Sequence, residues 1–540
     1  MHAHPNNNEK LVSDKEIPMK LTHLATAVFT ATLLTACGGG GGGSSSSSDD
    51  TGSGSHQINV ENVGKILQSN ATIAYRAYAD AVDAAQALKT ALTALRTDPS
   101  QANLEAARKA WLVAREPYGQ TEVYRFRATP VDSTTYPDDN EEGPEGAINA
   151  WPLGEALIDY VTVDTSAYGD FGDDQVGAFT TIDGIGEADA QSGTNEITAA
   201  YADANPSDNI IGDTSIEINT ALLEDNSEAG DGHDVISGYH AIEFMLWGQD
   251  LNDSAAITDG TDRDEAVKTE AVKDSASPEN AFASGGQRPV SDFQPGYDGS
   301  SVVFDNTEAS NRRHKFLEVV VDKLIADLTT VRDAWDPAGD GNFYDTFTTV
   351  ADEADAKTKL AEILTGMGTL AQGELAGERM LIALLANSQE DEHSCFSDNT
   401  HRDIWLNAEG ISNSYYGDYA GYDSTLDGLV GSGDETGRAY EGYGIDDYLN
   451  DAGLSDIKAE VEATLTETAS RYQAIDAKAR NGEPFDVLIM DSSNSEVQNT
   501  ILALYSESEA LEDLADALAI TSDITQDDAT GCDVSSLSCE

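Results

Sequence analysis

The chain has 540 residues and a formal net charge of −68 at pH 7, because its 98 Asp and Glu residues greatly outnumber its 30 Lys and Arg residues. A surface this acidic repels phosphate backbones, so the composition excludes nucleic acid as a partner. Apolar residues make up 39% of the chain, which at this length is enough to form one or two sizeable cores.

The N-terminal region, residues 1–36, has the pattern of a secretory leader. After Met19, the expected start, a lysine precedes the apolar run 21–36, which is too short to span a bilayer. Cys37 follows small residues, as in bacterial lipoprotein signals, so we expect it to be acylated. Gly38 at the next position favours the outer membrane. The sequence therefore predicts a bacterial outer-membrane lipoprotein that faces the periplasm or the cell surface.

Most of the remaining chain shows helical periodicity, in two sets of segments separated by acidic loops. Residues 37–58 contain the lipidated cysteine and a Gly/Ser tether, and residues 521–540 form a C-terminal tail. We expect a first helical bundle in 59–251, an acidic linker in 252–310 and a second bundle in 311–520. The expected helices are 59–96, 100–128, 144–163, 215–223, 235–251, 311–335, 353–388, 399–417, 445–480 and 493–520.

Strand-like alternation is nearly absent from these segments. Residues 165–215 are acidic and dotted with glycine, which indicates long surface loops. The predicted fold class is therefore all-α, with two antiparallel helical bundles and long acidic loops.

Three cysteines remain after Cys37. In an oxidising compartment, Cys395, Cys532 and Cys539 can form at most one disulfide. Because the polar tail has little reason to dock unless it is tied down, we expect Cys395 to be bonded to Cys532 or Cys539. A bond within the tail, between Cys532 and Cys539, is the competing assignment.

The sharpest site motif is a histidine–glutamate pair. His240 and Glu243 are three residues apart, so both project from the same face of a helix that is apolar all round and therefore buried. A buried carboxylate must meet a cation, a metal or hydrogen-bond donors. Imidazole plus carboxylate suits zinc or iron, with a third ligand from elsewhere. The alternative interpretation is a structural hydrogen bond that locks two helices.

A second candidate lies in residues 111–125, where aromatic and charged residues share one helical stripe. Arg115 and Arg125 flank Glu122 there. The stripe is either a salt-bridged face or the charged wall of a cleft in which Glu122 is available as a ligand.

A third candidate is the segment 392–403. Ser397 or Asp398 is the expected N-cap of the helix that follows, and Asp398 is either a cap alone or a metal ligand. His393 and His401 are the histidines of the second bundle that can join His240 across an interface.

Five sequence blocks together resemble the imelysin-like family of bacterial surface proteins: Arg115–Glu122, Ile148–Leu153, Gly238–Glu243, Leu375–Met380 and Glu392–His401. The resemblance implies two helical bundles that face each other. The family's signature histidine and glutamate map onto His240 and Glu243. The family is classed among metallopeptidases, and related domains occur in periplasmic iron-uptake systems.

The leading hypothesis is a surface or periplasmic lipoprotein that binds a metal ion or a small metal-containing ligand in a cleft between the bundles for metal acquisition. Iron is the expected metal, because carboxylate-rich surroundings suit a hard ferric ion. His240 and Glu243 would be ligands, with Glu122, Asp398 and His401 as contributors. Expected partners are the membrane, through the lipid anchor, and outer-membrane or periplasmic uptake proteins.

Two alternatives remain open from the sequence. One is a zinc-dependent peptidase in which Glu243 is a ligand or the general base for a metal-bound water. The other is a structural or adhesive lipoprotein. The sequence favours binding, because only two spaced ligands are evident and no motif assigns a separate base.

Overall fold

A computed structural model shows how the predicted helices are arranged. It describes residues 57–126, 129–134, 143–149, 151, 153–159, 209–212, 214, 216–224, 235–248, 286, 288–294, 306–386, 391–428, 437–522, 524 and 532–539. The expected leader, Cys37, nearly all of the tether and most of both acidic loop regions lie outside these residues. All described residues fall in a single unit, 54–540.

The first set of helices is built on a long hairpin. α1 (Val60–Thr97) and α2 (Gln101–Gly119) pack along each other, and Pro99 lies in the turn between them. α1 begins at Asn59, whose side chain accepts a hydrogen bond from the backbone N–H of Asn62. α8 (Gly238–Trp247) packs on α2. Short one-turn elements complete this set: η1 (Glu122–Tyr124), α3 (Glu145–Ile148), α4 (Glu155–Ile158), α7 (Thr220–Glu224) and η5 (Val290–Phe293).

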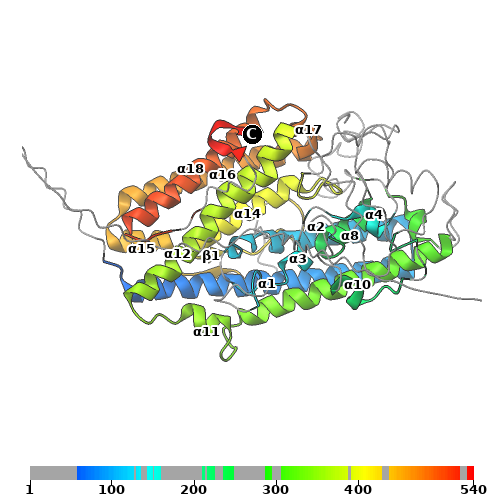
Figure 1. The fold of residues 1–540 in the computed structure, drawn as a ribbon, viewed down its shortest axis with the longest axis horizontal. Coiled ribbons are helices and arrows are strands. Elements are labelled where there is room, and N and C mark those ends of the chain that lie inside the picture. The colour runs from blue at the N-terminus through cyan, green and yellow to red at the C-terminus, as the bar shows by residue number, and fades with distance from the viewer. Residues whose placement is uncertain are drawn as a thin grey trace, which may run out of the picture. The chain divides into compact units, whose positions relative to one another are not determined.

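One long helix belongs to a different set from the one expected. α10 (Asn306–Ala334), which we expected in the second bundle, packs against α1 and α8 (Figure 1). Its periodicity was sufficient to predict a helix. The apolar stripe of a helix shows that one face is buried, but it does not specify which neighbouring helices bury it.

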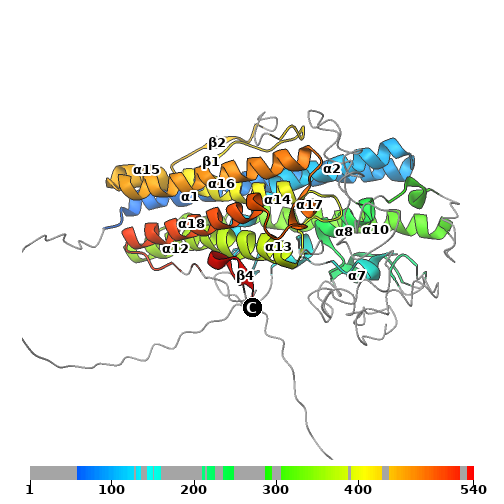
Figure 2. The ribbon, with the colours of Figure 1, turned by 90° about the horizontal axis from the view of Figure 1, so that it is seen from above.

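The second set packs around α18 (Ser495–Ala517). α16 (Ser455–Arg480), α12 (Glu353–Thr369) and the π-helix η6 (Leu370–Ile382) all contact α18, and α14 (Thr400–Tyr416) contacts α16 (Figure 2). Shorter helices of this set are α13 (Ala383–Ala386), α15 (Ile445–Ala452) and α17 (Phe485–Ile489), together with the 3-10 turn η8 (Val534–Ser536). The short helix α11 (Phe343–Thr348) packs on α1 of the first set.

The all-α prediction is confirmed for the described residues. Their strands form two antiparallel pairs of two residues each, β1 (Asp418–Tyr419) with β2 (Tyr440–Glu441), and β3 (Cys532–Asp533) with β4 (Ser538–Cys539). Leu153 and Val235 form an isolated parallel bridge. No described helix combines the length and the apolar composition needed to cross a membrane.

Several expected helices are divided or shortened. The segment 445–480 is split by Gly453, which ends α15 in the left-handed region at φ 73°. The segment 144–163 holds two separate turns, α3 and α4, consistent with Pro152 and Gly154 in its sequence. α2 ends at Gly119, just after Pro117, which cannot donate a backbone hydrogen bond. The middle of 353–388 is π-helical.

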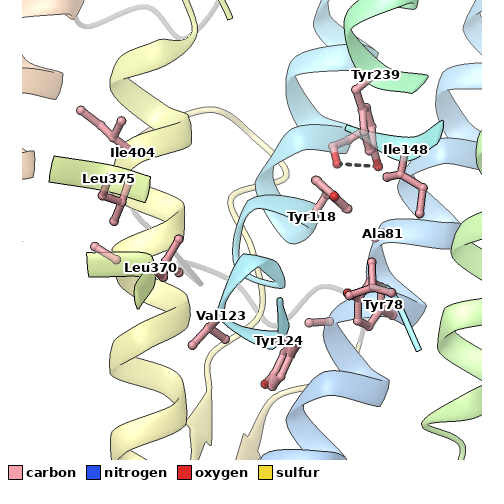
Figure 3. Packing of buried hydrophobic residues seen from close by; sticks show 14 of the residues in the cluster. Tyr78, Ala81, Tyr118, Val123, Tyr124, Ile148, Tyr239, Leu370, Leu375 and Ile404 are labelled. Carbon is pink, nitrogen blue, oxygen red and sulfur yellow. Dashed lines mark hydrogen bonds between the residues drawn. The ribbon is translucent and has the colours of Figure 1, made fainter. Parts of the chain in front are cut away.

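The two sets meet where α2 runs beside α14. A Cβ atom on Gly119 would lie 2.7 Å from the Leu406 Cβ, and one on Gly410 would lie 2.6 Å from the Gln120 carbonyl oxygen. Both helices therefore need glycine at this contact. The buried apolar cluster continues across it, from Tyr118 in α2 to Ile404 in α14 (Figure 3).

The strand register at the C-terminus bears on the two cysteine assignments. Cys395 is buried. The register of β3 and β4 places Cys532 directly opposite Cys539. The fold therefore favours the competing assignment, a bond within the tail.

We predict that peptide mapping under non-reducing conditions will recover a Cys532–Cys539 bond. Paired positions of an antiparallel ladder have Cα atoms about 4.5–5.5 Å apart, within the range of a disulfide. Recovery of Cys395 joined to either tail cysteine would contradict this assignment.

A second prediction concerns Glu507, which is buried on α18 and accepts a hydrogen bond of 2.6 Å from the Thr468 hydroxyl. Burial raises the pKa of Glu507 to about 7. The protonated Glu507 side chain therefore contributes its full stabilisation below about pH 4.5. This stabilisation decreases as the pH rises towards 7, where the buried carboxylate ionises. We expect Glu507→Gln to be more stable than the wild type at pH 8, by up to about 3 kcal/mol, and to differ much less at pH 4.5.

Denaturant unfolding at both pH values measures this difference. The control is Asp513→Asn, an exposed position on the same helix. Equal effects of Glu507→Gln at the two pH values would contradict the assigned cause.

Candidate functional site

The predicted pair is in contact inside the molecule. His240 and Glu243 lie on α8, both fully buried, and His240 Nδ1 is 2.8 Å from Glu243 Oε2. The second carboxylate oxygen, Oε1, accepts two hydrogen bonds from Ser397, one from its backbone N–H (2.9 Å) and one from its hydroxyl (2.6 Å). Ser397 lies between the π-helix η6 and α14. The pair thus joins α8 of the first set to a loop of the second.

Aromatic rings surround the imidazole of His240. The ring of Trp151 packs edge-on against it, with centroids 4.9 Å apart, and the ring of His393 does so at 4.8 Å. Phe396 contacts both Trp151 (5.5 Å) and Phe244 (5.3 Å). Inside this enclosure, His240 Nε2 is buried and has no hydrogen-bond partner among the described residues.

Burial governs the charge state of the pair. It lowers the pKa of His240 well below the usual range, and the positive charges of Arg115 and Arg379 act in the same direction. Burial also raises the pKa of Glu243 well above its usual value, although the hydrogen bonds from Ser397 oppose that effect. The imidazole is therefore neutral.

The protonation state of Glu243 decides whether Nε2 of His240 carries a hydrogen or a free lone pair. When Glu243 is ionised, Nδ1 donates to it and Nε2 presents a lone pair that can bind a metal. When Glu243 is protonated, it donates to Nδ1 and Nε2 carries the hydrogen. Burial favours the protonated form of Glu243, whereas the two hydrogen bonds from Ser397 favour the ionised form, the one that leaves Nε2 open.

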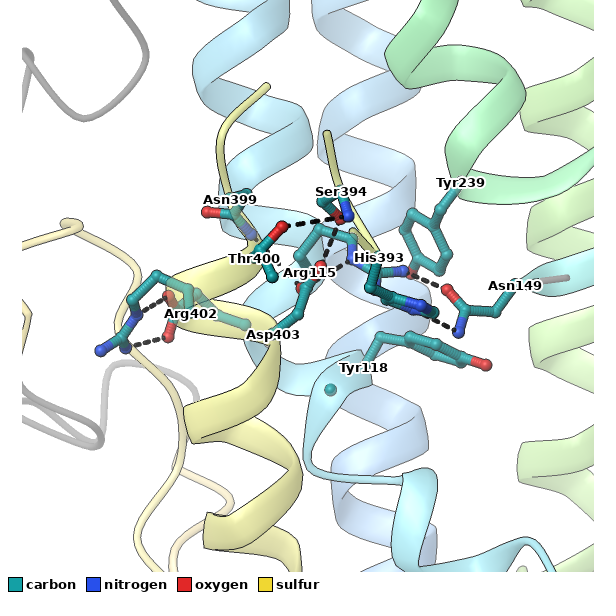
Figure 4. A network of polar contacts seen from close by, with 12 residues as sticks. Arg115, Tyr118, Asn149, Tyr239, His393, Ser394, Asn399, Thr400, Arg402 and Asp403 are labelled. Atoms are coloured by element: carbon teal, nitrogen blue, oxygen red, sulfur yellow. Dashed lines mark hydrogen bonds and ion pairs between the residues drawn. The ribbon is translucent and has the colours of Figure 1, made fainter. Parts of the chain in front are cut away.

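His393, the second imidazole, is held by a polar network around α2 and α14 (Figure 4). Asn149 Nδ2 lies 3.1 Å from His393 Nε2, and the Asn149 carbonyl accepts from Arg115. Arg115 also donates to Asp403 on α14 (3.1 Å), which accepts in turn from the Ser394 hydroxyl. Burial lowers the pKa of His393 well below its usual range, so this ring is neutral too.

Glu122 is engaged by cations. Its Oε2 accepts from Arg379 (3.0 Å) and Arg125 (3.2 Å), and its Oε1 is 3.4 Å from Asn149 Nδ2. Burial alone would raise the pKa of Glu122, but the arginines, Arg125 first, outweigh it and lower the pKa. The structure therefore has Glu122 in a salt-bridged network, one of the two interpretations of its stripe, with partners from η6 as well as from its own segment.

The π-helical backbone of η6 also pairs Arg379 with Glu374. Arg379 donates to Glu374 Oε1 (3.0 Å), a residue five positions earlier. Hydrogen bonding between i and i+5 in a π-helix brings such positions onto the same face, whereas an α-helix brings together i and i+4. The π-helical register therefore places Glu374 next to Arg379, and Arg379 also donates a hydrogen bond to Glu122.

His401 and Asp398 face other partners. His401 Nδ1 is 2.9 Å from the Asp398 carbonyl oxygen, and Nε2 is 3.5 Å from Asp476 on α16. Burial lowers the pKa of His401 to about 4. Of the two histidines expected to approach His240, His393 is the one the structure places against it. The N-cap of α14 is Asn399, and Asp398 precedes it with a left-handed φ of 58°.

The described residues contain no group of three or more His, Cys, Asp or Glu side chains arranged to hold a metal ion. The open donor at the site is a single nitrogen, His240 Nε2, with Glu243 acting on the other ring nitrogen. Carboxylate–histidine pairs of this kind orient the ligand histidine in metal sites. The residues present therefore fit a metal that carries part of its own coordination shell better than a bare ion.

Sequence analysis did not identify Asn149 and Ser394 as site residues, and it treated Ser397 only as a cap. Asn149 falls inside the Ile148–Leu153 block, and Ser394 and Ser397 fall inside the Glu392–His401 block. These blocks were therefore the available signal. Only the three-dimensional structure showed that residues of these blocks contact α8 and its histidine–glutamate pair.

Residues 74–518 match the family described as imelysin, peptidase M75. The chain belongs to the imelysin family. A stretch of 76 residues is 41% identical to iron-regulated protein A of Synechococcus elongatus. That match spans 14% of this chain and 18% of the relative's length.

The fold of this imelysin-family protein is similar to that of a solved structure. A crystal structure described as an iron-regulated protein A precursor, from Parabacteroides distasonis, matches with a TM-score of 0.50 over 86% of this chain and 97% of that one. The sequences are 13% identical, so the likeness concerns the fold alone. It agrees with the all-α prediction.

The buried network generates a prediction for stability. We expect Asp403→Ala to lower the free energy of unfolding by about 3–5 kcal/mol, because it leaves the guanidinium of Arg115 buried without its carboxylate. The matched control is Glu61→Ala, whose partner Lys65 is 3.9 Å away at an exposed site, with an expected loss below about 1 kcal/mol. Urea denaturation of both variants tests this; similar small losses would contradict it.

Proposed function

We propose that this imelysin-family protein binds a metal, iron by preference, through His240 Nε2 between its two sets of helices, and that it serves metal acquisition outside the bacterial cytoplasm. The observation that carries the proposal is the orphaned nitrogen: a buried, neutral imidazole whose other nitrogen is held by a carboxylate and whose Nε2 has no partner among the described residues. A buried polar atom without a partner is costly, so a bound group there would be stabilising.

The geometry supports different roles for the two residues. His240 would be the ligand. Glu243, which Ser397 holds by two hydrogen bonds, would orient the imidazole and increase its basicity rather than bind the metal itself. For Glu243 to become a ligand or a general base, it would have to leave both His240 and Ser397. This arrangement favours binding over hydrolysis.

A small metal-containing ligand suits the site better than a bare ion. With one open nitrogen in the ring cluster around His240, most of the coordination shell would arrive with the metal or come from elsewhere in the chain. The similarity of one segment to an iron-regulated protein supports iron as the metal. An N-terminal lipid anchor at Cys37 and a partner in periplasmic or outer-membrane uptake are parts of the same proposal.

The test is a metal titration of the purified protein by calorimetry with Fe²⁺ under anaerobic conditions, ferric citrate and Zn²⁺, beside variants. We expect His240→Ala to abolish binding of the preferred iron species and Glu243→Gln or Ser397→Ala to weaken it by about 10- to 100-fold. His314→Ala, a buried histidine on α10 whose Nε2 is 3.0 Å from the Phe293 carbonyl oxygen, is the matched control and should bind normally.

A peptide-library cleavage assay on the same samples separates the alternatives. Zinc-dependent cleavage lost in both His240→Ala and Glu243→Gln would replace the proposal by the peptidase. Unchanged metal content in all variants, with a lower melting temperature for His240→Ala, would leave only a structural pair.

A further inference from the structure

The ring of Trp151 differs from the other rings around His240 in its exposure. His240, Phe244 and Phe396 are at most 1% exposed, and His393 is 5% exposed, whereas Trp151 is partly exposed to solvent. Trp151 contacts both the imidazole of His240 and the ring of Phe396. It is therefore the member of this ring cluster that adjoins the solvent.

The described helical elements on either side of Trp151 are short. Trp151 lies between α3 and α4, each a single four-residue turn, and Pro152 and Gly154 follow it in the sequence. The other residues of the ring cluster are anchored more firmly. His240 and Phe244 lie within the ten-residue helix α8, and Phe396 lies next to Ser397, which is bonded to Glu243. Short turns have little cooperative stability of their own.

We propose that Trp151 controls access to His240 Nε2: its indole closes the ring cluster, and a ligand that coordinates Nε2 displaces it and then packs against its face. A ligand of matching chemistry is a transition-metal complex with a flat organic part, because the walls are aromatic and the open donor is an imidazole nitrogen. The ligand part of this inference rests on the proposed function, whereas the access part does not.

The access part can be tested without any metal. Diethyl pyrocarbonate acylates neutral imidazole at an unoccupied nitrogen, and peptide mass spectrometry reports the rate at each histidine. In chelator-treated protein, we expect Trp151→Ala to raise the rate at His240 several-fold, and Trp151→Phe, which keeps a ring, to stay close to the wild type. His314 and His401 in the same samples are internal controls and should be unaffected.

Two outcomes would overturn the proposal. One is an unchanged rate at His240 in Trp151→Ala. The other is an equal rise at all three histidines, because loss of the indole would then act by loosening the whole fold. A rise confined to His240 supports it.

The ligand part is tested by stopped-flow binding of ferric citrate and of a ferric catecholate, a complex with flat aromatic ligands. Faster association in Trp151→Ala for both, with a preference for the catecholate that is lost in that variant, is the expected result. Equal affinity of wild type and Trp151→Ala for the catecholate would overturn it. If neither complex binds the wild type, the proposed function and the ligand part fail together, and the labelling result still decides the access part.

Discussion

The arrangement of the molecule depends on a buried seam of ion pairs between α2 and α14. Arg402 donates to both oxygens of Glu116, at 2.9 and 2.8 Å, and at the adjacent position of each helix Arg115 donates to Asp403. All four side chains are almost completely buried. Charges in this environment are tolerated only when they are paired with good geometry, so the two helices have one stable register.

Glycine residues let α2 and α14 approach closely enough for these ion pairs to form. Gly119 and Gly410 lie where any side chain would collide with the opposite helix. The Asn407 side chain donates to the Gly119 carbonyl oxygen at 2.8 Å, which satisfies the end of α2. Close approach, ion pairing and helix termination thus occur at the same place, and the candidate site is built beside it.

The same contacts between α2 and α14 position the side chains around His240. Arg115 holds Asn149, which contacts His393, and His393 lies against His240. On the other side, the loop that leads into α14 supplies Ser397 to Glu243. The orientation of both imidazoles is therefore set by groups that also join the two sets of helices. A ligand at His240 Nε2 would be held by elements from both sets, as a binding site between two bodies requires.

The sequence alone determined the fold class, most of the long helices and the central pair. Helical periodicity is a local property, and the spacing of His240 and Glu243 places them on one face of any helix. The family resemblance was likewise carried by contiguous blocks. The tertiary structure decided which set contains α10, that η6 is a π-helix, that Cys532 rather than Cys395 is opposite Cys539, and that Glu243 is directed at Ser397. These depend on contacts between residues more than a hundred positions apart, or on backbone register, and no local pattern encodes them.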